Sequence, residues 1–190
     1  MEPWLKALTP PHIRSPISDQ GQSLLCLASV RAANAGHNNA TRLSTSTVYA
    51  GCIPLISGYF SGVGDLFSAL VLGHYHPPPL ENGTNASPSP SPSPSLESLP
   101  SSLPPLTRAV SLALTKTHAI LRLTDKHASS LPADERTTTD DELDKKDPER
   151  RIRRMRGREL RLVQGRKILT GEAMGKPRLL REWEEFWGPN

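Results

Sequence analysis

The sequence predicts an α/β fold in which a small folded part is combined with long unpacked segments. Short apolar runs of strand length are followed by longer segments with the apolar content or spacing of helices. Only 36% of the 190 residues are hydrophobic, 5% are aromatic and 19 are proline. This composition indicates that much of the chain does not contribute to a core.

The first half of the chain contains the predicted strands and one predicted helix. Ser23–Val30 (SLLCLASV) has the length of a buried strand. Thr45–Tyr49 is rich in β-branched residues, and Ile53–Phe60 is apolar but interrupted by a proline and a glycine, which favours an irregular or edge-like strand. Gly64–Tyr75 is apolar nearly all round, a pattern typical of a helix buried in a larger body.

A proline-rich segment and a long helix follow. Pro77–Pro105 contains the repeat SPSPSPSPS, which predicts extended or disordered chain, and a simple spacer is favoured over proline-directed phosphorylation sites. In Leu106–Lys126, apolar residues recur at helical spacing, so we expect an amphipathic helix with one buried face.

The last third is predicted to be mostly polar, with short elements near its end. Ser129–Glu149 is charged and expected to be mobile. Glu159–Gln164 is a strand candidate, and a helical turn is expected at Arg166–Leu169. A short amphipathic C-terminal helix is predicted from its apolar residues, which are Leu179, Leu180, Trp183, Phe186 and Trp187.

These segments predict six parts. They are an irregular N-terminal segment (1–22), a folded region with the glycine turn (23–76), a disordered Pro/Ser-rich insertion (77–105), a helix of the same domain (106–128), a charged mobile segment (129–157) and a C-terminal strand with helices (158–190).

The formal net charge of +4 is unevenly distributed. Acidic residues gather between Asp134 and Glu149, and arginines follow in RRIRRMRGR. That run is compatible with nucleic-acid binding or nuclear import, but it contains no aromatic residue for base stacking, so a solvated arm opposite the acidic stretch is favoured. His74 and His76 lie on different sides of a helix, which favours a helix-terminal pair over a metal site.

The cysteines and the N-terminal residues bear on the compartment. Cys26 and Cys52 form no metal-binding pattern and are interpreted as buried thiols of a reducing compartment. The first residues, MEPWLKALTPP, lack the apolar centre of a signal peptide, and no apolar run approaches about 18 residues. We therefore expect a soluble cytoplasmic protein, with the nucleus as a second location and no membrane association.

The stretch Gly58–Gly73 (GYFSGVGDLFSALVLG) carries the most specific chemical pattern. Backbone N–H groups at the start of a helix lack partners, and the helix dipole favours an anion there. Glycine lets phosphate oxygens approach closely, and a carboxylate beside them can accept the proton of an attacking hydroxyl. The pattern thus predicts a phosphate-binding turn, with a plain acidic residue in the first turn of a helix as the competing interpretation.

The same stretch resembles the GxGD anion-hole segment of ribokinase-like kinases, in particular pyridoxal kinases of the fungal type. Two further stretches agree with this. RAVSLALTKTHAILRLT resembles the helix that follows in those kinases, and RGRELRLVQGRKIL resembles their C-terminal ELR-[LM]-VQ segment. The resemblance implies a partial three-layer ribokinase-like fold that holds only the C-terminal strands and helices. It would lack the N-terminal strands, the lid over the pyridoxal ring and the surface through which such kinases dimerise.

The resemblance also implies an activity and the roles of individual residues. The activity would be ATP-dependent phosphorylation of the 5′-hydroxyl of pyridoxal, pyridoxine or pyridoxamine in vitamin B6 salvage. Asp65 would be the catalytic base, and Gly62, Val63 and Gly64 would form the anion hole for the ATP phosphates. The adenine side would be formed by Ile53, Pro54, Leu55 and Ile56.

The implied cofactors are ATP, Mg²⁺ or another divalent metal, and K⁺, with no metal ligand assigned to a residue. The alternative interpretation is a catalytically inactive fragment that binds a nucleotide or a partner and carries a basic arm.

Overall fold

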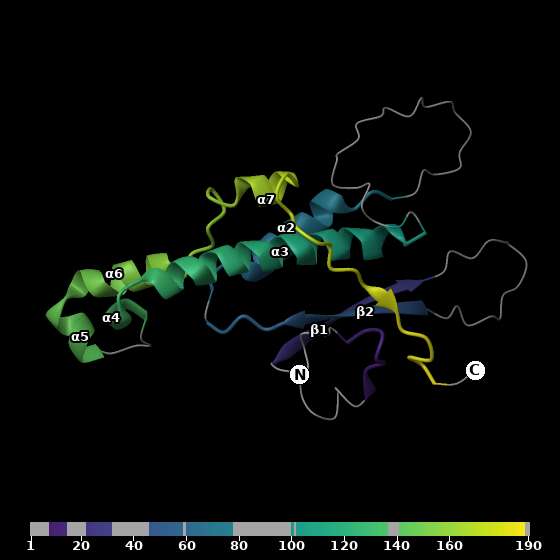
Figure 1. Cartoon of the computed structure of the whole chain (residues 1–190), viewed down its shortest axis with the longest axis horizontal. Coiled ribbons are helices and arrows are strands. Elements are labelled where there is room, and N and C mark those ends of the chain that lie inside the picture. Colours follow the sequence, from purple (N-terminus) through teal and green to yellow (C-terminus); the bar gives the residue numbers. More distant parts are fainter. Residues whose placement is uncertain are drawn as a thin grey trace, which may run out of the picture. The chain divides into compact units, whose positions relative to one another are not determined.

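The computed structural model describes residues 8–14, 22–31, 46–58, 60–77, 100, 102–136 and 141–188 (Figure 1). They contain helices and an antiparallel sheet, so the α/β class is confirmed at this coarse level. The chain divides into two compact units. The first comprises Met1–Leu55, Leu70–Leu112 and Pro177–Asn190, and the second comprises Ile56–Ala69 and Ala113–Lys176.

The sheet of the first unit has the strand order β1-β2-β3 among the described residues (Figure 1). Strand β1 (Ser23–Arg31) pairs with β2 (Ser46–Pro54) in an antiparallel register, and β3 (Arg181–Glu182) pairs with the other edge of β2. The predicted strand is confirmed as β1, but its predicted burial is wrong, since Leu24 and Leu27 are exposed. The strand predicted at Thr45–Tyr49 is confirmed from Ser46 onward, but it continues to Pro54, whose missing N–H cannot extend the ladder, so the separate strand predicted at Ile53–Phe60 is wrong beyond Pro54.

The two faces of β2 pack against different parts of the first unit. Successive residues of a strand point to opposite faces. On one face, Ala50 and Cys52 form a buried cluster with Ile13. On the other face, Gly51 leaves room for Leu180, since a Cβ there would lie 2.9 Å from Leu180 Cδ2. Leu180 is only 1% exposed, so the absence of a side chain at Gly51 is what admits it.

The predicted C-terminal helix is wrong, because this segment pairs with the sheet. The N–H of Trp183 donates to the carbonyl of Val48 at 2.8 Å, which continues the contact that β3 begins. Beyond β3 the chain forms turns in which Phe186 makes edge-to-face contacts with Trp183 and Trp187. The segment therefore forms a strand and turns despite its helical spacing of apolar residues, because the edge of β2 offers hydrogen-bond partners for its backbone.

Helix α2 (Val63–His74) begins within one residue of the predicted start. The predicted burial is wrong, since none of its 12 residues is buried and Leu72 is 77% exposed. One side of α2 is half-buried and the other is exposed, so its apolar surface is only partly covered in the described part of the chain.

Helix α3 (Pro105–Ser130) confirms the predicted amphipathic helix. Its first residue is a proline, which suits the start of a helix because no intrahelical N–H bond is lost there. The predicted single buried face is wrong for the middle of the helix, because the five consecutive residues Ala109–Ala113 are all buried and therefore cover every side of it. Of the predicted apolar face, the buried residues are Val110, Ala113, Thr117, Ile120 and Thr124.

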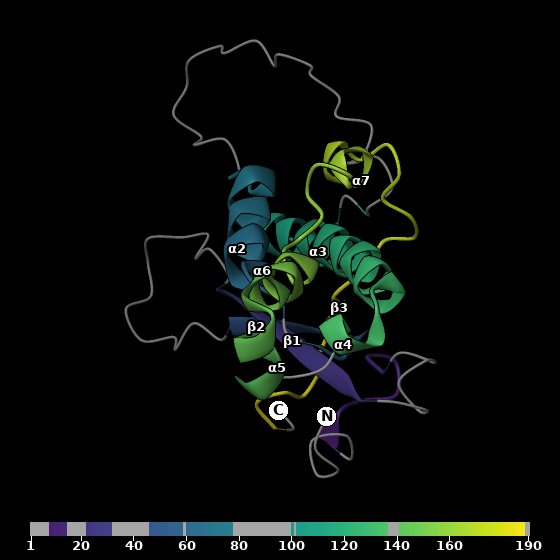
Figure 2. The same cartoon turned by 90° about the vertical axis from the view of Figure 1, so that its left-hand side faces the viewer.

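The charged segment 129–157, which the sequence predicts to be mobile, contains helices in the residues that the structure describes. It contains α4 (Ala133–Arg136), α5 (Asp141–Lys146) and α6 (Pro148–Gly157), and α4 and α5 both contact α6 (Figure 2). The side chain of Asp147 caps α6 by accepting from the N–H groups of Glu149 and Arg150. Residues 137–140 and most of the insertion 77–105 lie outside the described residues.

The predicted strand Glu159–Gln164 is wrong except at its first residue. Glu159 forms one parallel bridge with Ser61, and the chain then turns. The helical turn predicted at Arg166–Leu169 is confirmed as α7 (Arg166–Thr170), which ends at Gly171 with a left-handed φ of 92°.

Replacing Gly165 by Ala tests the packing of α7 in the second unit. A Cβ at Gly165 would overlap Ile120 Cδ1 and lie 3.0 Å from the carbonyl oxygen of Arg161. Because Ile120 is completely buried, we expect the free energy of unfolding to fall by about 1–3 kcal/mol, measured by urea denaturation. The loss should be smaller when Ile120→Val has first removed Cδ1. An equal loss in both backgrounds would contradict this packing.

Candidate functional site

The predicted glycine turn leads directly into helix α2 in the second unit. Gly62 has a φ of 81°, a left-handed conformation that glycine adopts without strain. The N–H of Leu66 donates to the carbonyl of Gly62 at 3.0 Å, which is the first hydrogen bond of the helix. The N–H groups of Val63, Gly64 and Asp65 therefore come before the first intrahelical donor, the N–H of Leu66, and point out of the helix start.

Gly64 is a glycine that the chain's own structure does not require. A Cβ at this position would meet nothing within 4 Å, and its φ is not among the positive values. In a helix, glycine costs about 1 kcal/mol relative to alanine. Gly73, near the end of the same helix, also faces open space. Packing and backbone conformation thus explain Gly62 but leave Gly64 without a structural reason.

Asp65 lies in the first turn of α2, and it is exposed. The sequence predicted that it would lie beside a bound anion rather than in solvent. Its position also suits a carboxylate that stabilises the positive end of the helix dipole. Both interpretations of Asp65 are therefore compatible with its place in the fold.

The turn lies beside the segment that follows α6. The N–H of Ser61 donates to the carbonyl of Arg158 at 3.2 Å, next to the parallel bridge between Ser61 and Glu159. The Cβ position of Gly62 is 4.0 Å from Leu160 Cδ1. Residues from the glycine stretch and from the RGRELRLVQ stretch are thus neighbours in the second unit.

Helix α3 contacts the same segment. The N–H of Arg161 donates to Thr124 Oγ1 at 3.1 Å, and Lys116 Nζ donates to the carbonyl of Leu169 in α7 at 2.6 Å. Burial lowers the pKa of the Lys116 ammonium group. Parts of all three stretches that carry the family resemblance therefore lie in one compact unit.

The predicted adenine-side residues do not all belong to the unit that holds the turn. Ile53 and Pro54 are the half-buried end of β2 and, with the 40% exposed Leu55, belong to the first unit. Ile56 is half-buried and belongs to the second unit. The adenine contacts stay a prediction.

A cavity of about 280 Å³ in the second unit was not expected from the sequence. Its wall includes Phe60, the α3 residues Asp125 and Ala128, and Arg158 after α6. None of Gly62, Val63, Gly64 and Asp65 lines it, so it is separate from the predicted turn. Its residues come from three distant stretches of the chain, which is why no local sequence signal indicated it.

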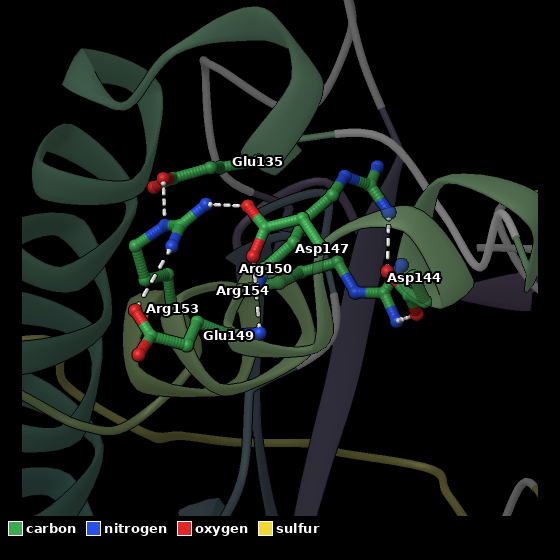
Figure 3. Close-up of polar contacts among 7 residues, drawn as sticks. All are labelled: Glu135, Asp144, Asp147, Glu149, Arg150, Arg153 and Arg154. Carbon is green, nitrogen blue, oxygen red and sulfur yellow. Dashed lines mark hydrogen bonds and ion pairs between the residues drawn. The ribbon is translucent and has the colours of Figure 1, made fainter.

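The arginine run forms a buried ion cluster, so the predicted solvated arm is wrong for two of its residues. Arg150 and Arg154 are 3% and 4% exposed, and both bind the carboxylate of Asp144, at 2.5 and 2.8 Å (Figure 3). The prediction that the arginines lie opposite the acidic stretch is confirmed. Their spacing of one helical turn is the signal that could have revealed a shared partner.

Arg153 forms the second part of this cluster, nearer to solvent. Its guanidinium nitrogens lie 2.6 Å from Oε1 of Glu135 in α4 and 2.6 Å from Oδ2 of Asp147 (Figure 3). Oε2 of Glu149 is more distant, at 3.8 Å. The hydrogen bond from Arg153 holds the pKa of the Asp147 carboxyl below its ordinary value. Asp147 thus caps the start of α6 and also forms an ion pair with Arg153 of the same helix.

Cys26 and Cys52 are not in a disulfide; Cys52 is buried and Cys26 is half-buried, and burial raises the pKa of the Cys26 thiol. The search for metal sites found no group of three or more His, Cys, Asp or Glu side chains among the described residues. No helix within those residues has both the length and the apolar character needed to span a membrane. Comparison with protein-family models, curated proteins and solved structures gave no match to the chain.

Asp144→Asn tests the buried ion cluster. The substitution removes the negative charge shared by two buried guanidinium groups, so we expect the free energy of unfolding to fall by about 3–5 kcal/mol. The matched control is Glu149→Gln, since Glu149 is 84% exposed and its removal should change stability by about 1 kcal/mol or less. Urea denaturation of both variants measures the difference. Equal, small losses would show that Asp144 does not hold this cluster.

Proposed function

We propose that the chain carries the phosphate-binding turn and the catalytic base of an ATP-dependent kinase that phosphorylates the 5′-hydroxyl of pyridoxal. The observation that carries the proposal is the glycine at position 64. Nothing in the described chain requires a glycine there, and it costs helix stability. A phosphate group that approaches the backbone closely supplies the missing reason. The pyridoxal substrate itself rests on the sequence resemblance.

The turn would act through its backbone. The N–H groups of Val63, Gly64 and Asp65 precede the first intrahelical hydrogen bond of α2, and the dipole of this 12-residue helix adds positive potential there. Together they would stabilise negative charge on the transferred phosphoryl group as it passes from ATP to the acceptor.

Asp65 would accept the proton of the attacking hydroxyl. Its carboxyl group, one residue beyond the glycine turn, is within the same first helical turn as the N–H groups that would hold the phosphate. Asp65 would therefore lie close to the hydroxyl whose oxygen attacks the bound phosphorus, and it could accept the proton of that hydroxyl. Its exposure leaves room for an acceptor to reach it.

The donor set at the turn fits ATP with a divalent cation. Mg²⁺ in phosphoryl-transfer sites is held by phosphate oxygens and one or two carboxylates, and it neutralises charge on the phosphates. Asp65 would act as the base, so the cation would be held by the phosphate oxygens of ATP, and no metal ligand is assigned to a residue. The chain's own contribution would be the N–H groups that orient the phosphates.

A second candidate is a nucleotide- or partner-binding fragment without catalytic activity. The observation that favours it is the exposure of Asp65 together with the cavity that none of the turn residues lines. A catalytic carboxylate works best where water is excluded, because charges interact more strongly there. Under this candidate the turn binds phosphate while no acceptor is held beside Asp65.

Asp65→Asn tests the catalytic proposal. We expect the formation of pyridoxal 5′-phosphate, followed spectroscopically with ATP and Mg²⁺, to fall about 10²–10⁴-fold, because the amide cannot accept the proton. ATP binding should change little. If the parent chain is folded and binds ATP but forms no product, the second candidate is supported. Equal activity in both proteins would remove Asp65 from the proposed role.

Gly64→Ala and Gly73→Ala form a matched pair that tests the phosphate-binding turn. Both positions are in α2 and face open space, so each alanine should raise stability by up to about 1 kcal/mol. Only Gly64→Ala should weaken ATP binding, by about tenfold or more in a titration calorimeter, because its methyl group obstructs the phosphate. Unchanged ATP affinity in Gly64→Ala would refute the turn as the binding site.

A further inference from the structure

Helix α6 uses its arginines in two different ways. Arg150 and Arg154 are buried and paired with Asp144, and Arg153 is paired with acidic residues of α4 and of the start of α6. The side chains of Arg151 and Arg156 are exposed and have no ion-pair or hydrogen-bond partner among the described residues. Acidic groups of the chain therefore pair with three of the five arginines in this helix.

The two remaining arginines flank an apolar strip. At about 100° per residue, Arg151, Met155, Ile152 and Arg156 follow one another across an arc of about 140° of the helix. Arg150, Arg154 and Gly157, which are buried, lie on the opposite side. Ile152 is 53% exposed and Met155 is 51% exposed. We call the four residues Arg151, Ile152, Met155 and Arg156 the outer face of α6.

We propose that the outer face of α6 is a docking surface for an acidic, amphipathic segment of a partner protein. Carboxylates of the partner would pair with Arg151 and Arg156, and its apolar side chains would cover Ile152 and Met155. The partner should be acidic by charge complementarity, since within the described part of the chain no carboxylate pairs with the arginines on this face, while those on the inner side are paired. The surface is distinct from the glycine turn and does not depend on kinase activity.

The chemistry of the outer face favours a protein over other anionic partners. Nucleic-acid phosphates would satisfy the arginines but leave the apolar strip uncovered, and the face has no aromatic side chain on which a base could stack. A lipid surface requires a wide apolar face, and two apolar side chains provide little area for insertion. An acidic helix with apolar residues at helical spacing meets both requirements of the face.

The test uses a labelled synthetic peptide of roughly 18 residues, in which leucines stand at helical spacing and glutamates occupy positions between them. Its binding to the whole chain is followed by fluorescence anisotropy. We expect the double variant Arg151→Gln/Arg156→Gln to weaken binding by about tenfold or more, and Ile152→Gln/Met155→Gln to weaken it by a similar factor. The matched control is Arg122→Gln/Lys126→Gln, which removes two exposed charges from α3 and should leave binding unchanged.

Circular dichroism of each variant establishes that the helices are retained. Absence of peptide binding by the parent chain would overturn the proposal. So would an equal loss in the α3 control, or a loss confined to the arginine variant, because either result indicates general charge attraction. Tighter binding of a single-stranded oligonucleotide or of vesicles containing phosphatidylserine would overturn it in favour of another partner class. Neither ATP nor pyridoxal enters the assay, so its outcome is separate from that of the kinase proposal.

Discussion

Two buried hydroxyl groups of helix α3 each hold a backbone segment that is distant in the sequence. Ser111 Oγ donates to the carbonyl of Thr107 at 2.8 Å and accepts the N–H of Leu180 at 3.1 Å. Thr124 Oγ1 donates to the carbonyl of Ile120 at 2.9 Å and accepts the N–H of Arg161 at 3.1 Å. Because a buried N–H without an acceptor costs about 1–3 kcal/mol, each hydroxyl stabilises the contact between α3 and one such segment within its own unit.

Within the second unit, the segment that Thr124 holds also contacts the glycine turn. Thr124 fixes the backbone at Arg161, and the residues just before it form the bridge and the contacts to Ser61 and Gly62. The turn is therefore supported from the side by a segment that α3 holds in place. The contacts hold the backbone of the turn in place, and the proposed phosphate-binding groups are N–H groups of that backbone. The ion cluster on α6 stabilises the chain immediately before that segment.

Sequence reasoning located the elements whose formation depends on local pattern and missed those that depend on distant partners. Strand β1, helix α3 and the start of α2 at the glycine turn follow from run length, periodicity and the glycines. The C-terminal segment looked helical because its pairing with Val48 is a tertiary contact. The helices α4 to α6 looked mobile because their charges pair with one another across helices rather than with solvent. For the site, the turn was predictable, whereas the exposure of Asp65 was not.

The most direct test of the central claim is a map of backbone amide chemical shifts in the ¹⁵N-labelled chain on addition of a non-hydrolysable ATP analogue with Mg²⁺. If the turn binds phosphate, the amide signals of Gly62, Val63, Gly64 and Asp65 should move most and saturate together. Shifts centred on the cavity residues Asp125, Ala128 and Arg158, with the turn signals unmoved, would contradict the account.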